Sequence, residues 1–350
     1  SCTKYESPAS VAGGLVKTDS VGLTLTRKLL WVNIDGAKGT IVKEMSEAGE
    51  LPNITSLLSH AKYTFKGISD SGFGVPGESV SSSGEDPLTW ADMLTGVNGY
   101  LHMIHDGSYT ADYQIGSSGG LNQTIAFFPT IVQYLSSAND KLHVSVVSPF
   151  NNLNKYLGDA YSVKTTTDDA ETQEELNKQL AGDDNQLTIA SFKSVWEAGK
   201  QGGFSASNTQ YIEALKKVDE YIGSLKKTIE ERPNPSYEDW MIILSSNRGG
   251  TSDGKHDSYT DADRDIFGIF YYDHYTPYEM KGEEIEVPLF AGSDKLQATI
   301  PDSMALYRLT NQDLALDFNI KMMPKSDGGY DAGGGWYKIM GKNSWGIYRQ

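Results

Sequence analysis

Apolar positions recur along the chain with two periods, and the longest helical pattern lies past its middle. Between residues 207 and 235 apolar residues follow one another at steps of three and four, namely Ile212, Leu215, Val218, Ile222, Leu225 and Ile229. This spacing places them on one face of a helix, which Pro233 and Pro235 should end. Residues 241–244 then form a short continuous apolar run, which predicts a strand buried on both faces, as in a parallel sheet.

Strand and helix patterns alternate over most of the chain. Short apolar or β-branched runs predict further strands at residues 29–34, 63–66, 143–148, 187–195 and 266–271. Helical patterns lie between them, at residues 39–49, 51–61, 89–96, 124–138 and 170–180. This alternation predicts an α/β fold with a mostly parallel central sheet.

The length of the chain and changes in its pattern of apolar and polar residues indicate three parts. A chain of 350 residues is too long for one ordinary core. Residues 1–26 are polar without a period and are interpreted as a tether, and residues 27–283 hold the α/β pattern. Residues 284–350 consist of short alternating apolar segments separated by Gly, Asp and Asn, which predicts the beginning of an all-β, sandwich-like module.

Charge and cysteine content narrow the choice of partner and compartment. A formal net charge of −16 without a basic cluster argues against nucleic acid, because phosphate backbones are bound mainly by Lys and Arg. Cys2 is the only cysteine, and the polar stretch after it resembles the acylation site of a bacterial lipoprotein. We therefore expect an extracytoplasmic protein that is lipid-anchored at Cys2 to the outer membrane or cell surface; the alternative is an ordinary thiol near a frayed end.

Polar residues follow two of the predicted strands at their carboxyl ends. Asp35 comes directly after residues 29–34, and Asn247 and Arg248 come shortly after residues 241–244. Because open α/β sheets bind ligands at the carboxyl edge of their strands, these side chains are the first candidates for a site.

Three stretches together resemble the alkaline phosphatase superfamily, in particular its type I phosphodiesterase/nucleotide pyrophosphatase branch in secreted bacterial lipoproteins. They are WVNIDG followed by LPNITSLL, then TWADMLTGVNGYLH, then VDEYIGSL followed by WMIILSSNRGG. The resemblance covers roughly residues 28–275 and implies an α/β/α sandwich. The tail from residue 314 is similar to the opening strands of a concanavalin/laminin-G-like sandwich.

The resemblance implies a two-zinc site in which a Thr or Ser attacks phosphorus. Carboxylates and imidazoles hold such ions, which activate the nucleophile and neutralise phosphoryl oxygens. In this chain Asp35 matches the first metal ligand. The nucleophile position falls on Asp86, or on Glu85 if Pro87 marks an insertion, and neither residue carries a hydroxyl.

The remaining ligand positions of the family are also changed. Trp196 and Lys200 stand where ligands are expected, Asn247 and Arg248 replace an Asp-His pair, and only His256 matches a ligand type. Fixed positive charge repels Zn²⁺, and arginine keeps its charge at any physiological pH. We therefore expect no cofactor, a lost two-zinc site, and Arg248 or Lys200 within salt-bridge distance of Asp35.

Two readings of this cluster stay open at the level of sequence. It is either a structural group of ion pairs or a pocket that still binds phosphate or sulfate without chemistry. The first functional hypothesis is a degenerate, metal-free phosphodiesterase-like binding module for glycans or an anionic ligand. The alternative is an active metal-dependent phosphoesterase that uses Ser83 or Thr89 as nucleophile, although Thr89 is also interpreted as a helix cap. A third reading makes the β module the functional unit.

Other clusters carry weaker signals. His102, His105 and Asp106 could bind a metal, but spacing alone is poor evidence. The acidic run from residue 261 to residue 265 lacks the Gly and the final Glu of a calcium loop. Sulfatase chemistry of the same superfamily, in its cysteine form, is excluded because Cys2 lies outside any catalytic motif.

Overall fold

The computed structural model describes residues 16–18, 24–70, 84–111, 128–139, 141–182, 185–233, 237–256 and 261–281. The chain divides into two units, Ser1–Lys281 and Gly282–Gln350. The second unit lies outside the described residues, and so do Cys2 and Ser83. The β-sandwich, the acylated cysteine and the tether therefore stay predictions, except that the predicted tether contains a short strand and the start of another.

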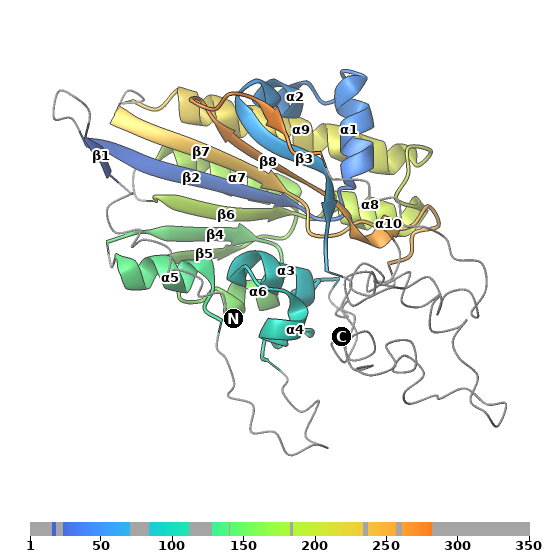
Figure 1. Ribbon diagram of the computed structural model, residues 1–350, viewed down its shortest axis with the longest axis horizontal. Coiled ribbons are helices and arrows are strands. Elements are labelled where there is room, and N and C mark those ends of the chain that lie inside the picture. Colours follow the sequence, from blue (N-terminus) through green and yellow to red (C-terminus); the bar gives the residue numbers. More distant parts are fainter. Residues whose placement is uncertain are drawn as a thin grey trace, which may run out of the picture. The chain divides into compact units, whose positions relative to one another are not determined.

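One mixed sheet organises the described part of the first unit (Figure 1). Its strands are β1 Val16–Thr18, β2 Thr24–Ile34, β3 Ala61–Ile68, β4 Val144–Ser148, β5 Ser162–Thr165, β6 Leu187–Phe192, β7 Glu238–Ser245, β8 Asp265–Tyr272 and β9 Tyr278–Glu279. They lie in the order β5-β4-β6-β2-β7-β8-β3-β9, with β1 antiparallel to β2. From β5 to β7 all neighbours are parallel, so the mostly parallel sheet is confirmed.

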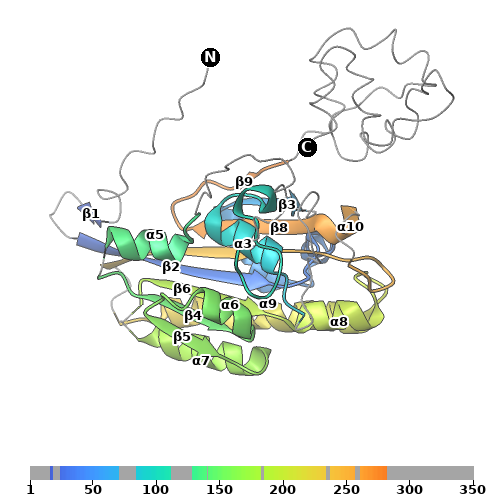
Figure 2. The same ribbon diagram turned by 90° about the horizontal axis from the view of Figure 1, so that it is seen from below.

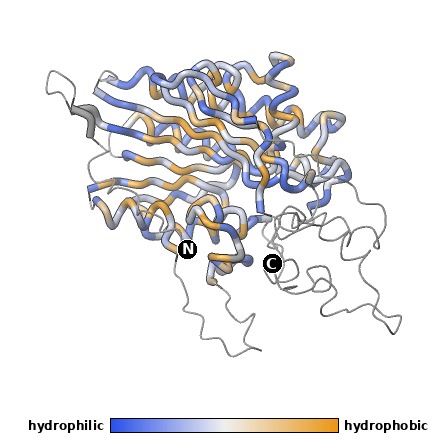
Figure 3. Tube along the Cα trace, viewed as in Figure 1, coloured by the Kyte–Doolittle hydropathy of each residue, from blue (hydrophilic) through white to orange (hydrophobic). Residues whose placement is uncertain are grey.

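Helices cover both faces of this sheet (Figure 2). They are α1 Gly39–Glu47, α2 Pro52–Leu57, α3 Pro87–Thr95, α4 Gly99–His102, α5 Ile131–Ala138, α6 Asn151–Tyr156, α7 Asp169–Ala181, α8 Ser194–Gly202, α9 Thr209–Glu230 and α10 Asp261–Arg264, with a 3-10 turn at Leu58–His60. One apolar core joins α1, α2, α7, α8 and α9 to Leu30, Val32 and Ile34 of β2. A second core joins α3, α5 and α6 to the opposite face, where Leu29 and Trp31 lie. Hydrophobic residues accordingly gather along the central strands (Figure 3).

The long helix α9 forms where its apolar spacing predicts it. Leu215, Val218, Ile222, Leu225 and Ile229 are buried, while Ile212 is only partly buried. The helix ends at Glu230, ahead of the prolines. Its length and its apolar face make it the main cover of the first core.

The buried side of α9 also carries one carboxylate. Asp219 accepts hydrogen bonds from the backbone N–H of Asn53 (3.1 Å) and of Ile54 (2.7 Å), and from the Asn53 side chain (2.8 Å). It therefore caps the amino end of α2, whose first residue is Pro52.

Four local predictions need correction. The strand predicted at 241–244 is present as the longer β7, which is parallel to β2 and antiparallel to β8. It is not buried on both faces, since Met241 and Ile243 are only half-buried. The helix predicted at 124–138 begins at Ile131, behind a Thr130 capping box. The strand predicted at 187–195 ends at Phe192, because α8 begins two residues later. The cap of α3 is Asp86 rather than Thr89.

None of the helices in the described ranges has the length and apolar character that crossing a membrane requires.

Candidate functional site

The centre of the candidate site is an ion pair between Asp35 and Arg248. Asp35 directly follows β2 and Arg248 follows β7, two adjacent parallel strands, so both side chains come to the same carboxyl edge. Both side chains are fully buried. The guanidinium donates from Nε to Oδ1 (2.7 Å) and from Nη2 to Oδ2 (2.8 Å). This two-point contact is the strongest geometry that an arginine and a carboxylate can form, and it is the pairing expected from the sequence.

The indole of Trp196, on α8, covers the guanidinium. The Cζ atom of Arg248 lies 3.3 Å from the centroid of the indole ring, which is cation–π stacking. The close approach depends on Gly36, whose φ of +80° is left-handed and whose added Cβ would lie 2.7 Å from the Trp196 Cα. Trp196 thus closes the ion pair off from water.

The amino end of α3 forms a second wall. Asp86 caps the helix, and Thr89 donates from Oγ1 to the Asp86 carbonyl (3.4 Å). The Asn247 amide donates to the same Thr89 oxygen (3.2 Å) and accepts from Asn33 (2.9 Å). The carbonyl of Gly84, just ahead of α3, accepts from Arg248. Residues at the expected nucleophile position therefore lie beside the ion pair.

His256 completes the cluster from the loop beyond β7. Its Nδ1 donates to the Gly249 carbonyl (2.9 Å), since a carbonyl can only accept. Its Nε2 lies 3.6 Å from Asp86 Oδ2, and its Nδ1 lies 3.7 Å from Asp263 Oδ1. The ring also packs edge-on against Trp196, with centroids 5.4 Å apart.

Lys200 does not belong to this cluster, so its placement among the site residues needs correction. Its side chain is exposed, and its ammonium lies 5.8 Å from the centroid of the Trp196 ring. Arg248 alone supplies the charge that was expected from either residue.

Comparison with known proteins identifies the fold. No family model and no curated protein sequence matches the chain. Among solved structures, a 2-O GAG sulfatase and a candidate sulfatase from Bacteroides thetaiotaomicron each align with a TM-score of 0.50 and 12% identity over 70% of this chain. The domain has the alkaline phosphatase-like fold. This chain spans 64% of the length of those two structures. A protein of the alkaline phosphatase superfamily from Vibrio parahaemolyticus also aligns, with a TM-score of 0.45 and 11% identity over 72% of this chain and 62% of that one.

The residues at the carboxyl edge of this alkaline phosphatase-like domain do not fit the two zinc ions that the resemblance implies. Both oxygens of Asp35 bind Arg248, and His256 already uses Nδ1 on a carbonyl. The side-chain amide of Asn247 already makes hydrogen bonds with Asn33 and Thr89. In the described part of the chain no three His, Cys, Asp or Glu side chains are placed to share an ion.

Burial shapes the protonation of the groups around the ion pair. Burial raises the pKa of Glu85, against the lowering effects of two backbone N–H groups and Arg248. Burial also raises the pKa of Tyr109 well above its ordinary value, and the charges of Glu85 and Asp86 add to this effect. Within the described residues the Tyr109 hydroxyl and Arg248 Nη1 are buried without a hydrogen-bond partner. Two polar atoms at this edge therefore lie buried without a protein partner, where an enclosed water could satisfy them.

The second histidine cluster of the sequence serves the structure instead. His102 Nδ1 accepts from the backbone N–H of Ile104 (2.9 Å), so Nε2 carries the proton and donates to Asp92 Oδ1 (2.8 Å). Asp106 binds the N–H of Ser108 (2.8 Å). Both nitrogens of His102 are thus occupied, and the three residues do not converge on a metal site.

The His102–Asp92 pair predicts opposite pH effects on stability. Burial lowers the pKa of His102 to about 4, from 6.5, and raises that of Asp92 to about 9, from 3.8. Between pH 6.5 and 4 His102 is protonated in the unfolded chain but neutral in the folded protein. The free energy of unfolding therefore falls as the pH drops from about 6.5 to about 4. Folded Asp92 keeps a proton that the unfolded chain releases, so the free energy of unfolding also falls as the pH rises from about 4 to about 9.

Urea unfolding at several pH values tests this prediction. We expect Asp92→Asn to become more stable relative to wild type as the pH rises from 5 to 8, and His102→Gln to lose less stability than wild type between pH 6.5 and 4.5. Parallel curves for wild type and both variants would contradict it.

Sequence reasoning missed several members of the cluster. Asn33 lies two residues before Asp35 on β2, so strand alternation alone could have placed it on the same face. Gly84, Tyr109 and Asp263 carry no comparable signal, because their proximity depends on loops.

Proposed function

We propose that this alkaline phosphatase-like domain is catalytically inactive and metal-free, and that it serves as an extracytoplasmic binding module. The observation that supports the proposal best is the buried, two-point ion pair of Asp35 with Arg248. The guanidinium uses the carboxylate oxygens that a metal would need. Removal of dications would otherwise leave Asp35 as an uncompensated buried charge, which is strongly destabilising.

The ligand that we favour is a glycan rather than a free inorganic anion. Asp35 binds Arg248, Glu85 lies near enough to sense its charge, and Asp86 lies beside His256, so an added phosphate or sulfate would meet carboxylates as well as the guanidinium. The hydroxyl groups of a neutral sugar would add no charge beside these carboxylates. One of the structures that share the fold is a 2-O GAG sulfatase, which supports a glycan as the ligand class proposed for this chain. Acylation at Cys2 would hold the module at the membrane surface.

Metal analysis and turnover assays on the full chain test the loss of activity. After incubation with Zn²⁺ and dialysis we expect well under one zinc per chain, and no release of p-nitrophenol from the phosphate monoester, the phosphate diester or the sulfate ester. Stoichiometric zinc together with turnover would refute the proposal. It would restore the active phosphoesterase, whose candidate Thr89 would then have to leave its bonds to Asn247 and Asp86.

A thermal shift assay tests the ligand class. A bound glycan raises the melting temperature by mass action, so we expect oligosaccharides from a glycan panel to raise it while 10 mM phosphate or sulfate does not. A shift caused by the free anions alone would contradict the glycan and favour the anion pocket.

A further inference from the structure

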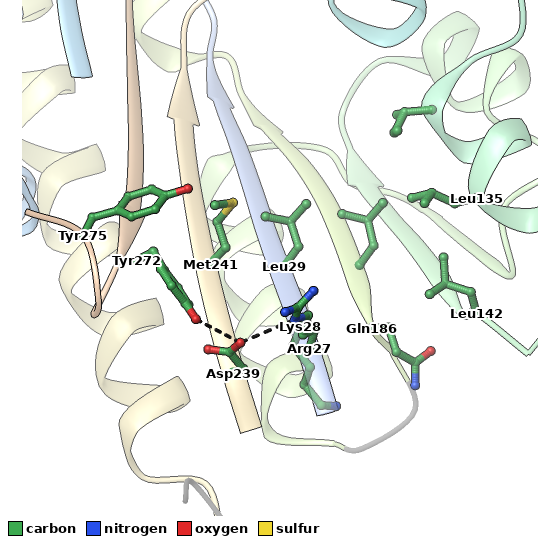
Figure 4. Close-up of a pocket in the computed structure, with 12 residues that line it drawn as sticks. Arg27, Lys28, Leu29, Leu135, Leu142, Gln186, Asp239, Met241, Tyr272 and Tyr275 are labelled. Carbon is green, nitrogen blue, oxygen red and sulfur yellow. Dashed lines mark hydrogen bonds and ion pairs between the residues drawn. The ribbon is translucent and has the colours of Figure 1, made fainter. Parts of the chain in front are cut away.

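A pocket of about 450 Å³ lies at the opposite edge of the sheet, where the parallel strands begin (Figure 4). It opens beside residues 27–29 of β2 and the first residues of β6 and β7, and it is bordered by α5 and the end of β8. Eight residue steps along β2 lead from Arg27 at this edge to Asp35, which is roughly 26 Å at 3.3 Å per residue. The pocket is therefore independent of the candidate site and of the function proposed for it.

The walls of the pocket are aliphatic. They are formed by Leu29, Ile131, Leu135, Leu142, Leu187 and Met241. These residues come from five places in the chain, and most of them are only partly buried. The volume of the pocket lies within the range of roughly 300 to 1,000 Å³ that is usual for small-molecule sites. A hydrocarbon body entering it would remove half-exposed apolar surface from water.

Three polar side chains, those of Arg27, Asp239 and Tyr272, lie together on one side of the pocket. Tyr272 donates to Asp239 Oδ2 (3.0 Å), and Arg27 Nε lies 3.6 Å from the same oxygen (Figure 4). The Asp239 side chain is 9% exposed, whereas that of Arg27 is 40% exposed. The Arg27–Asp239 pair carries no net charge, but the guanidinium has five N–H donors and meets Asp239 through Nε alone, at this long distance. The polar side therefore offers a ligand unused N–H donors on a half-exposed guanidinium.

We propose that this pocket binds a single-chain amphiphile, with its hydrocarbon body against the aliphatic wall and an anionic head at Arg27. Charge complementarity selects the head, because a carboxylate accepts the guanidinium donors that Asp239 leaves unused. A cationic head would face Arg27 directly.

Calorimetric titration of the full chain with dodecanoate, and with dodecanol as its neutral counterpart, tests the proposal. We expect dodecanoate to bind at least tenfold more tightly than dodecanol, and Arg27→Gln to remove that difference. Ile131→Asp places a carboxylate on the wall at the first position of α5, where an acidic residue suits the helix dipole. It should weaken dodecanoate binding at least tenfold.

Tyr134→Asp is the matched control, because Tyr134 lies on the same helix, is 65% exposed and does not line the pocket. It should leave both affinities unchanged. Absence of dodecanoate binding, or equal loss in the Ile131 and Tyr134 variants, would overturn the pocket as the site. Equal affinity for the acid and the alcohol in wild type would overturn the anionic head.

Discussion

Arg248→Ala is expected to lower the free energy of unfolding by about 3–5 kcal/mol. The substitution leaves the Asp35 carboxylate fully buried, without the guanidinium that now contacts both of its oxygens. It also removes the cation from the face of Trp196. Urea denaturation followed by circular dichroism measures the loss directly.

Two further variants separate charge from packing. Asp35→Asn combined with Arg248→Met removes both charges and keeps most of the volume, so it should recover much of the lost stability. Lys200→Ala is the matched control, because Lys200 lies near the same indole but is exposed, and it should change stability by less than about 0.5 kcal/mol. A loss below about 1 kcal/mol for Arg248→Ala would show that the ion pair does not support the fold.

Trp196→Ala is expected to cost about 3–5 kcal/mol, the usual range for truncating a buried tryptophan. The indole is 5% exposed and packs against Phe204, His256 and Arg248. Its loss would open a cavity above the ion pair and admit water to Asp35. Thermal and urea unfolding measure the effect.

Tyr237→Ala, at a 49% exposed aromatic, serves as the control and should be nearly neutral. Trp196→Phe keeps an aromatic face and should lose less than the alanine variant. Equal loss for the alanine and phenylalanine variants would show that the aromatic face makes no separate contribution.

The sequence predicted the layers of the fold because the spacing of apolar residues determines which side chains share the buried face of a helix or strand. The buried face of α9 follows from spacing, and the buried strands β4 and β6 follow from short apolar, β-branched runs, although β6 ends three residues earlier than predicted. The antiparallel neighbour of β7 does not, since an apolar run is compatible with either pairing direction. Tertiary contacts determine which strands pair, and the local sequence of one strand carries no information on those contacts.

The candidate site was predicted in part, for reasons that can be named. Asp35 and Arg248 come together because adjacent parallel strands deliver their final residues to one edge. Lys200 was placed in the site because it matches a ligand position of the family, yet it lies on the last turn of α8, which is exposed. The cap at Asp86 carried a readable signal, since Pro87 favours the first position of a helix.

The Asp219 contact has a consequence for the route by which the chain folds. Helix α2 has six residues, too few to be stable alone in water. Its amino end is satisfied by a carboxylate 165 positions later in the chain. Closing so long a loop is slow compared with forming α9 itself. During synthesis α2 therefore cannot form stably until most of the domain has been made. The segment that becomes α2 stays unstructured until α9 packs against it.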